Sequence, residues 1–497
     1  MRRPVVGRVP AAFAVLLTAA CAVGPNYRKP EVPVSDRYRE SPPPDWEFAA
    51  PSDGIPRGPW WEMFGDPGLD ALEEQVAISN QNVKQAEAAY RVARAVARGA
   101  RADLFPTVTG NAGVTRSQGA AHAATGAGAT PGVADFYSVS ADVSWEIDVW
   151  GRIRRNVEAQ VEAAQASEAD LENARLSFQA ELAADYFALR EADAEKDLLD
   201  TNVAGYERAL TLTTDRFRQG VVSAVDVAQA QTQLSATRAQ ATDVALRRAQ
   251  LEHAIAVLVG KPPAALSLPP APLTADPPAI PTVLPSELVE RRPDVASAER
   301  QVAAANARIG VAEAAFFPAL GLSASGGYGN SVISHLFSLP DRFWSIGASL
   351  VGTLFSGGKR RAAKEQAVAG YDAAVASYRQ SVLTAFQDVE DQLAALRLLG
   401  DEAKDQAEAV AAAERSLSLA QTRYTGGITS YLEVITAETA ALANERAAVQ
   451  LRDRRMAAAV SLVRALGGGW RASDLPSGSA VLSHSAASAP RRDAGPR

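Results

Sequence analysis

Residues 136–149 read FYSVSADVSWEIDV, a stretch in which apolar and polar side chains alternate. Every second residue from Tyr137 to Val149 is apolar, and a period of two predicts a β-strand with one apolar and one polar face. Residues 152–218 follow almost at once, without proline and with the single glycine Gly205, which predicts a very long helix. The polar face of the strand carries three acids, Asp142, Glu146 and Asp148.

Three other stretches alternate in the same way, within residues 107–115, 320–325 and 344–354. They complete two predicted β-hairpins, 106–149 and 318–355. Their strands of about ten residues are long enough to cross a bilayer when the strands are tilted. A soluble sheet packed on a core is the alternative, but here long helices rather than further strands separate the hairpins. Because four strands are too few to close a barrel, and open edges are not tolerated in lipid, insertion into a membrane would require an oligomer.

An internal repeat organises the chain. RFRQGVVS at 216–223 recurs as RYTGGITS at 423–430, and the same spacing carries Gly151 onto Gly358. Each half therefore holds a predicted hairpin of long helices, 152–259 and 359–466, whose apolar residues recur at alternating steps of four and three, as in a coiled coil. Glycine is expected to end the outgoing helices, and serine to cap the returning ones; these residues are Gly220, Gly427, Ser223 and Ser430.

The beginning of the chain resembles an export signal. Arginines precede a short apolar core within residues 1–20, and the only cysteine, Cys21, follows small residues. We interpret Cys21 as a lipid attachment site, the alternative being a buried or incidental cysteine. The proline-rich stretch 21–59 predicts an extended tether.

The remaining divisions follow from composition. The first repeat is placed at 60–260, a proline-rich linker at 261–285 and the second repeat at 286–470. Residues 471–497 are rich in Ser, Ala and Pro and are predicted to be disordered.

Composition also excludes several classes of function. The net charge is −7, without the basic footprint of a nucleic-acid-binding protein. The four histidines are isolated and no metal-ligand spacing occurs, so we expect no catalytic site, metal or cofactor. Ser356-Gly357-Gly358-Lys359 faintly resembles a phosphate loop but lacks the first glycine of that motif. A structural coiled-coil lipoprotein is a further alternative, although it would not need amphipathic strands.

Three segments resemble a known family. They are CAVGPNYRKP at 21–30, WWEMFGDPGL at 60–69, and RRPDV at 291–295 with its continuation to Phe317-Pro318. The chain resembles the TolC-type outer-membrane efflux proteins, in their lipidated OprM-like or NodT branch. The resemblance implies a mixed α and transmembrane β fold: a homotrimer with a twelve-stranded β-barrel and a long periplasmic α-helical coiled-coil barrel.

The resemblance also implies a function and partners. The chain would be the outer-membrane exit channel of a tripartite efflux system for small molecules, lipid-anchored and with a long periplasmic part. Its partners would be outer-membrane lipid, a periplasmic adaptor protein and an inner-membrane transporter of the resistance-nodulation-division class. The alternative within the same fold is the outer-membrane duct of a polypeptide (type I) secretion system.

Site residues follow by position. The helical tips would dock the adaptor through Arg216, Gly220, Val221, Ser223, Arg423, Gly427, Ile428 and Ser430. Glu433, with its repeat mate Asp226, would narrow and polarise the periplasmic entrance; a solvated helix face is the alternative. The family often has an Asp and an Arg where this chain has Thr436 and Thr429, which removes part of that charged constriction. Charge on a lipid face is costly, so the barrel lumen would be lined by Asp142, Glu146 and Asp148.

Overall fold

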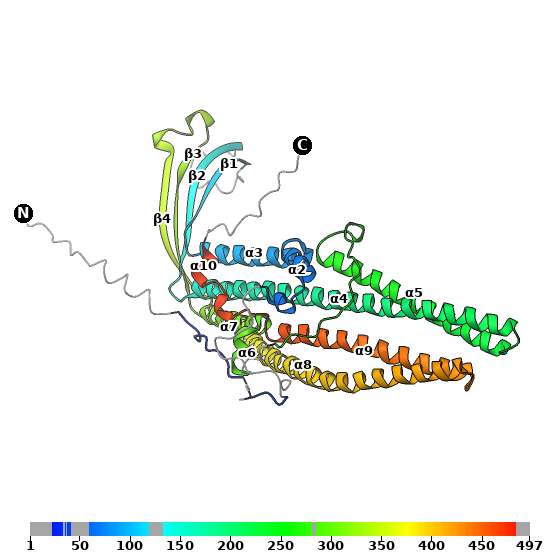
Figure 1. Ribbon diagram of the computed structural model, residues 1–497. Helices are drawn as coiled ribbons and strands as arrows, with labels where there is room; N and C mark the ends of the chain where they lie inside the picture. The colour runs from blue at the N-terminus through cyan, green and yellow to red at the C-terminus, as the bar shows by residue number, and fades with distance from the viewer. Residues whose placement is uncertain are drawn as a thin grey trace, which may run out of the picture.

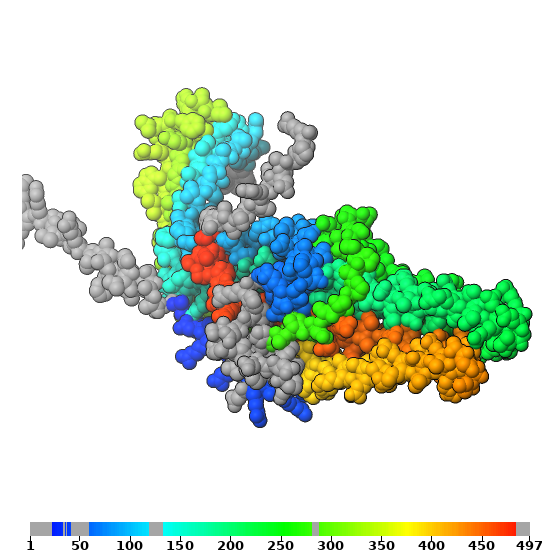
Figure 2. Space-filling model, in the orientation of Figure 1, coloured from blue at the N-terminus to red at the C-terminus, as the bar shows by residue number. Residues whose placement is uncertain are grey.

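The computed structural model describes residues 22–32, 35, 37–40, 59–118, 133–280 and 285–483. The expected export signal, Cys21 and residues 484–497 lie outside this described part. A four-stranded sheet stands at one end of the molecule, and two long helical hairpins extend away from it (Figure 1). Figure 2 shows the two hairpins as neighbouring arms that run in the same direction.

The strands form one antiparallel sheet in the order β1-β2-β3-β4. Their bounds are β1 Thr107–Gln118, β2 Val133–Ile147, β3 Ala319–Asn330 and β4 Arg342–Val351. The register sets Val143 opposite both Val108 and Ala324, and sets Asp142 opposite Thr109 and Ser325. Since directly paired residues point to the same side of a sheet, the apolar positions of neighbouring strands coincide, and so do the polar ones.

The two long helices that follow the hairpins have equal lengths. Helices α4 and α8 each have 67 residues, which corresponds to about 100 Å at the usual rise of an α-helix. Helices α5 and α9, each of 35 residues, return along them. The bounds are α4 Arg152–Arg218, α5 Ala224–Leu258, α8 Lys359–Thr425 and α9 Tyr431–Ala465. The expected internal repeat is therefore a repeat of structure.

Shorter elements surround the base of the hairpins. They are η1 Trp60–Phe64, α2 Pro67–Ser79, α3 Gln81–Ala102, η2 Pro263–Ala265, α6 Pro285–Arg291, α7 Pro293–Ala314, η3 Ile333–His335, η4 Leu339–Asp341, η5 Ala472–Asp474 and α10 Gly478–Leu482. The main core lies here, around the fully buried Trp60, Tyr186 and Tyr378. No helix of the described residues is long and apolar enough to span a bilayer.

The RRPDV segment is a structural joint. Pro293 opens α7 at its first position, where the missing N–H costs nothing. Arg292 donates to Asp294 at 2.7 Å, to Asp388 on α8 at 2.9 Å and to the carbonyl of Ala465 at the end of α9. One arginine thus fixes the start of α7 against both helices of the second hairpin.

Part of the predicted disordered tail is folded. Residues 471–483 form η5 and α10, and Val481 is fully buried among Ala97 of α3 and Val161 and Ala164 of α4. Ser477 accepts from the N–H of Ala480 and caps α10. The prediction of disorder is wrong for these residues, because a few apolar contacts with helices far away in sequence outweigh a composition rich in Ser, Ala and Pro.

Candidate functional site

The polar face of the sheet is organised around Asp142. Its Oδ2 accepts from Nδ2 of Asn111 at 2.6 Å and from Oγ of Ser140 at 2.9 Å. Glu146 lies on the same face, near the helical end of β2, and pairs with Arg152 of α4 at 2.8 Å. Both acids are thus held on the hydrophilic side of the sheet, where the sequence predicts them.

Asp148 has a different place from the predicted one. It follows the end of β2, and its carboxylate accepts from the backbone N–H groups of Ile153 at 3.0 Å and Arg154 at 2.8 Å. Its side chain is 9% exposed and also pairs with the Arg154 guanidinium at 3.2 Å. Asp148 therefore caps α4 rather than continuing the polar strand face, because β2 ends at Ile147, one residue before it.

Both helical tips have the same backbone turn. Gly220 and Gly427 have φ of 74° and 72°, the left-handed region that glycine enters without strain. The N–H of Val221 donates to the carbonyl of Arg216, and that of Ile428 to the carbonyl of Arg423, both at 2.9 Å. This six-to-one bond completes a Schellman motif and satisfies the last carbonyls of α4 and α8.

The returning helices are capped differently in the two repeats. Ser223 and Asp226 form a capping box at the start of α5, in which Asp226 accepts from the Ser223 backbone N–H at 2.8 Å. Ser430 makes no side-chain cap at the start of α9, and Glu433 pairs instead with Arg423 at 3.4 Å. Asp226 is thus committed to its own helix end, whereas Glu433 is half exposed and pairs, within the described part of the chain, with Arg423 alone.

The two tips touch through aromatic contacts and leave apolar residues exposed. The Arg216 guanidinium of the first tip lies 5.0 Å from the ring centre of Tyr424 of the second, which in turn packs on Tyr431 at 5.3 Å. Two aliphatic positions recur on each tip and are 55–73% exposed: Val221, Val225, Ile428 and Leu432. The two tips thus carry equivalent exposed aliphatic residues at equivalent positions.

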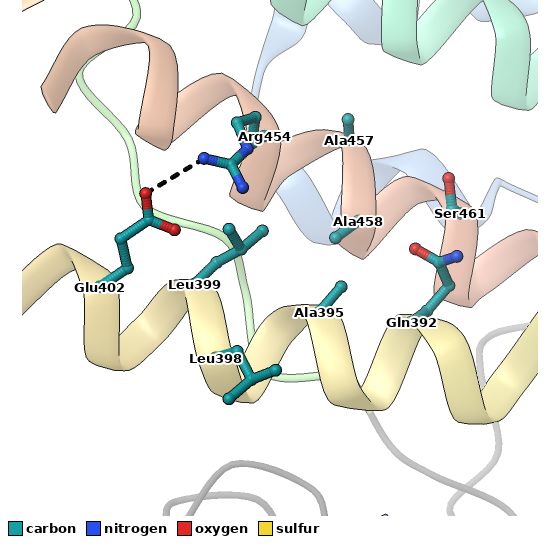
Figure 3. Close-up of a pocket in the computed structure, with 9 residues that line it drawn as sticks. All are labelled: Gln392, Ala395, Leu398, Leu399, Glu402, Arg454, Ala457, Ala458 and Ser461. Carbon is teal, nitrogen blue, oxygen red and sulfur yellow. Dashed lines mark hydrogen bonds and ion pairs between the residues drawn. The ribbon is translucent and has the colours of Figure 1, made fainter. Parts of the chain in front are cut away.

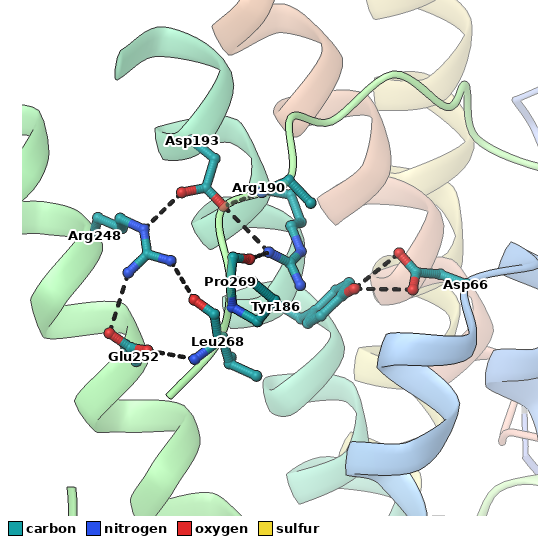
Figure 4. Close-up of polar contacts among 9 residues, drawn as sticks. Asp66, Tyr186, Arg190, Asp193, Arg248, Glu252, Leu268 and Pro269 are labelled. Carbon is teal, nitrogen blue, oxygen red and sulfur yellow. Dashed lines mark hydrogen bonds and ion pairs between the residues drawn. The ribbon is translucent and has the colours of Figure 1, made fainter. Parts of the chain in front are cut away.

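A network of charges fixes the linker between the repeats to the first hairpin (Figure 4). Asp193 of α4 accepts from Arg248 of α5 at 2.6 Å and from Arg190 at 3.2 Å. Arg248 also donates to the carbonyl of Leu268, and Arg190 to that of Pro269. The sequence analysis did not find this network, because its members lie on separate helices and form no motif.

Among the described residues, burial raises the pKa of three carboxyl groups on helices to about 7 or higher. Burial raises the pKa of Glu438 on α9, near the tips, to about 7. Burial, and next to it the charges of Glu195 and Asp453, raises the pKa of Glu191 on α4 to about 7 although Arg247 opposes the shift. Burial and then Asp70 raise the pKa of Glu73 on α2 to about 9, so this carboxyl is neutral near pH 7.

The described residues do not converge on an enzyme-like site. The groove between α8 and α9 in Figure 3 has Ala395, Ala457 and Ala458 along it and one ion pair, between Glu402 and Arg454, at 3.2 Å. A small-molecule site needs several convergent polar groups in an apolar cleft, which this groove lacks. No group of histidine, cysteine or acidic residues in the described part of the chain is arranged to hold a metal ion.

Known proteins share this architecture over nearly the whole chain. OpmQ of Pseudomonas aeruginosa, a pyoverdine export outer membrane protein, is 32% identical over 86% of this chain and 91% of its own length. The outer membrane protein OprJ of the same species is 32% identical over 95% of this chain and 97% of its own. The solved outer-membrane channel OprN superposes with a TM-score of 0.80 at 32% identity and covers 90% of this chain and 100% of its own.

The open-state channel MtrE of Neisseria gonorrhoeae superposes with a TM-score of 0.79 at 28% identity, over 91% of this chain and 99% of its own. The resemblance to TolC-type, OprM-like proteins is thereby confirmed. The family model described as outer membrane efflux protein matches residues 72–261 and 284–468, well over half of the chain. The chain therefore belongs to the outer membrane efflux protein family, as a channel component of the outer membrane rather than an enzyme.

Proposed function

We propose that three copies of this chain join their sheets into a twelve-stranded barrel in the outer membrane, which forms the exit of a tripartite efflux system for small molecules. The observation that carries the proposal is the sheet itself. One face combines apolar residues of all four strands, and within the described residues β1 and β4 have no further strand beside them. In lipid such edges must be paired, so β4 of one copy would pair with β1 of the next.

The helical hairpins would continue the barrel as a periplasmic tunnel. The repeats, 60–260 and 286–470, would each supply one hairpin, a division supported by the two separate segments that match the family model. Glu433 would contribute one carboxylate per copy to the entrance, partly compensated by Arg423 at 3.4 Å. Asp226 is a weaker candidate for this constriction because its carboxylate is used by the capping box.

The exposed aliphatic residues of both tips support docking of a periplasmic adaptor. Val221 is 66% and Ile428 73% exposed, each directly after the glycine of its Schellman motif. The same turn in both repeats would present equivalent apolar contacts around the tunnel entrance. An inner-membrane transporter of the resistance-nodulation-division class would then supply the cargo through the adaptor.

Lipidation of Cys21 is supported by where the next residues lie. The N–H of Val23 donates to the carbonyl of Trp150 at 3.0 Å, at the joint between β2 and α4. Gly24, with φ of 101°, approaches Gly310 of α7 so closely that a Cβ would lie 2.4 Å from the Gly310 Cα. Acyl chains on Cys21 would thus start at the level where the sheet meets the helices.

The names of the relatives support small molecules as cargo. They include a pyoverdine export protein, toluene efflux pump proteins and an antibiotic efflux pump protein. These cargoes favour small-molecule efflux over the alternative of polypeptide secretion.

Accumulation of a panel of fluorescent dyes, in a strain that lacks the gene, tests this function. The intact gene should lower accumulation of at least one dye, and Ile428→Asp should abolish the effect because a charge would be buried against the adaptor. Ile428→Val is the matched control, since it keeps the tip apolar. Unchanged accumulation of every dye, together with loss of a secreted polypeptide, would instead identify a secretion duct.

A further inference from the structure

The four segments that join strands to helices all lie at the same end of the sheet's strands. The register pairs Thr107 at the start of β1 with Ser144 near the end of β2, and Ala319 at the start of β3 with Val351 at the end of β4. Because the strands are antiparallel, residues 103–106, 148–151, 315–318 and 352–358 therefore lie along one line, as Figure 1 shows. If the sheet crosses the membrane, this line lies at the level of the lipid headgroups that face the helices.

The joint of the first repeat is electrically balanced. Arg152, Arg154 and Arg155 open α4, and each has an acidic partner. The closest N–O distances are 2.8 Å to Glu146, 3.2 Å to Asp148 and 2.8 Å to Glu158. This joint offers no free cation.

The equivalent joint of the second repeat is not balanced. Lys359, Arg360 and Arg361 open α8, but Thr353 and Phe355 stand at the positions that Glu146 and Asp148 occupy in the first repeat. Among the described residues no carboxylate pairs with these three cations, and the first turn of α8 contains no acid. Lys359 and Arg361 are exposed, and the Arg360 guanidinium lies 5.4 Å from the ring centre of Phe316.

Large exposed apolar side chains precede these cations in the chain. Leu354 is 99% and Phe355 89% exposed, directly before α8, and Leu350 on β4 is 67% exposed. A surface that combines free cations with exposed apolar side chains complements an amphiphile with an anionic head and hydrocarbon chains.

We propose that the joint of residues 353–361 binds an anionic phospholipid, with the headgroup phosphate at Lys359 and Arg361 and the acyl chains along Leu354 and Phe355. This inference rests on the proposed function, which places the sheet in the membrane. A second copy of the chain does not replace the lipid. A second copy whose β1 pairs with β4 would bring the segment that precedes β1, where Arg101 and Asp103 carry no net charge, so the three cations would stay without net compensation.

The test uses the purified oligomer in detergent and native mass spectrometry with added phosphatidylglycerol or phosphatidylcholine. The unaltered protein should retain phosphatidylglycerol preferentially, and the triple variant K359Q/R360Q/R361Q should bind it about 100-fold more weakly, since each basic residue near a headgroup strengthens binding several-fold. The control K84Q/R208Q/R415Q removes equal charge from exposed helix positions and should bind normally. K359R/R361K keeps the charges and should also bind normally.

Three results would overturn the proposal. They are equal retention of the two lipids by the unaltered protein, undiminished phosphatidylglycerol binding by the triple variant, and dissociation of that variant into single chains that still bind the lipid. The last result would assign the cations to contacts between copies. Flotation of the unaltered protein with vesicles separately reports whether the sheet inserts. Failure of insertion would remove the proposed function, whereas insertion without lipid preference would remove only this inference.

Discussion

Oε1 of Glu195 on α4 lies 2.7 Å from Nε and 2.6 Å from Nη2 of Arg446 on α9, and Oε2 lies 2.5 Å from Arg247 of α5. The Glu195 side chain is only 1% exposed. Burial opposes its ionisation, but the hydrogen bond and charge of Arg446, together with Arg247, hold the pKa of Glu195 below its usual value. One carboxylate thus joins helices of both repeats well away from the tips.

Glu195→Gln should destabilise the protein by about 1.5–3 kcal/mol, because it removes the charged hydrogen bonds to Arg446 and Arg247, although Arg247 keeps its ion pair with Glu191 at 2.8 Å. Chemical unfolding followed by far-UV circular dichroism measures the loss. Glu207→Gln is the matched control: its partner Arg238 is also on α5 at 2.5 Å, but both side chains are about half exposed. Its effect should stay below about 1 kcal/mol. Equal losses in both variants would show that Glu195 does not join the hairpins.

Glu73→Gln should change the pH dependence of stability. The pKa of Glu73 is about 9 in the folded chain, far above that of an unfolded glutamate, because of burial and Asp70. The folded state therefore binds the proton more tightly, so its stabilising effect is complete below about pH 4 and is lost progressively up to about pH 9. Glutamine keeps the neutral form at every pH.

The variant and the unaltered protein should therefore melt alike near pH 5, and the variant should be more stable at pH 8. Thermal melts at the two pH values measure this difference. Glu74→Gln, at the exposed neighbouring position, should give no such divergence. A constant difference between Glu73→Gln and the unaltered protein at both pH values would contradict a buried neutral carboxyl.

Gly467→Ala should prevent correct assembly of the base of the hairpins. Gly467 has φ of 89°, and an added Cβ would lie 2.0 Å from the carbonyl oxygen of Arg291, the last residue of α6. Gly400→Ala is the matched control, because nothing lies within 4 Å of its Cβ position inside α8. It should stabilise α8 by up to about 1 kcal/mol. The yield of folded oligomer on a native gel distinguishes the two, and a normal yield for Gly467→Ala would disprove the close contact.

The periodic parts of the fold were predictable from the sequence. Long segments without proline, ended by Gly220 and Gly427, predicted the helix ends to within a residue or so, because local backbone preferences decide them. The alternation around Asp142 likewise predicted which strand residues share a face. Both signals repeat every few residues and need no knowledge of distant contacts.

The contacts between distant segments were not predictable. Asp148 caps α4 although it continues the polar pattern of the strand. Ser223 caps α5, whereas its repeat mate Ser430 makes no side-chain cap at the start of α9. Val481 orders a tail that its composition predicts to be disordered, and Glu195 finds Arg446 across 251 positions. Each outcome depends on which side chains of other elements lie nearby in the folded chain, and a single sequence does not contain that information.

Glu433 and Asp226 should separate charge selectivity from helix capping. Glu433→Gln should lower the preference of the reconstituted channel for cations, because its carboxylate is half exposed and only one arginine compensates it. Asp226→Asn should leave ion selectivity unchanged but cost about 1 kcal/mol of stability through the weakened capping box. Reversal potentials across a planar bilayer under a salt gradient measure selectivity, and thermal melts measure stability.

Arg423→Gln should change the cation preference of the same entrance in the opposite direction. It removes the cation 3.4 Å from Glu433, so the Glu433 carboxylates should act uncompensated and the preference for cations should increase. Opposite shifts from Glu433→Gln and Arg423→Gln would be difficult to obtain from a general disturbance of the tip, since both variants break the same ion pair. Unchanged selectivity in both variants would instead place Glu433 on a solvated helix face, outside the narrowest part of the tunnel.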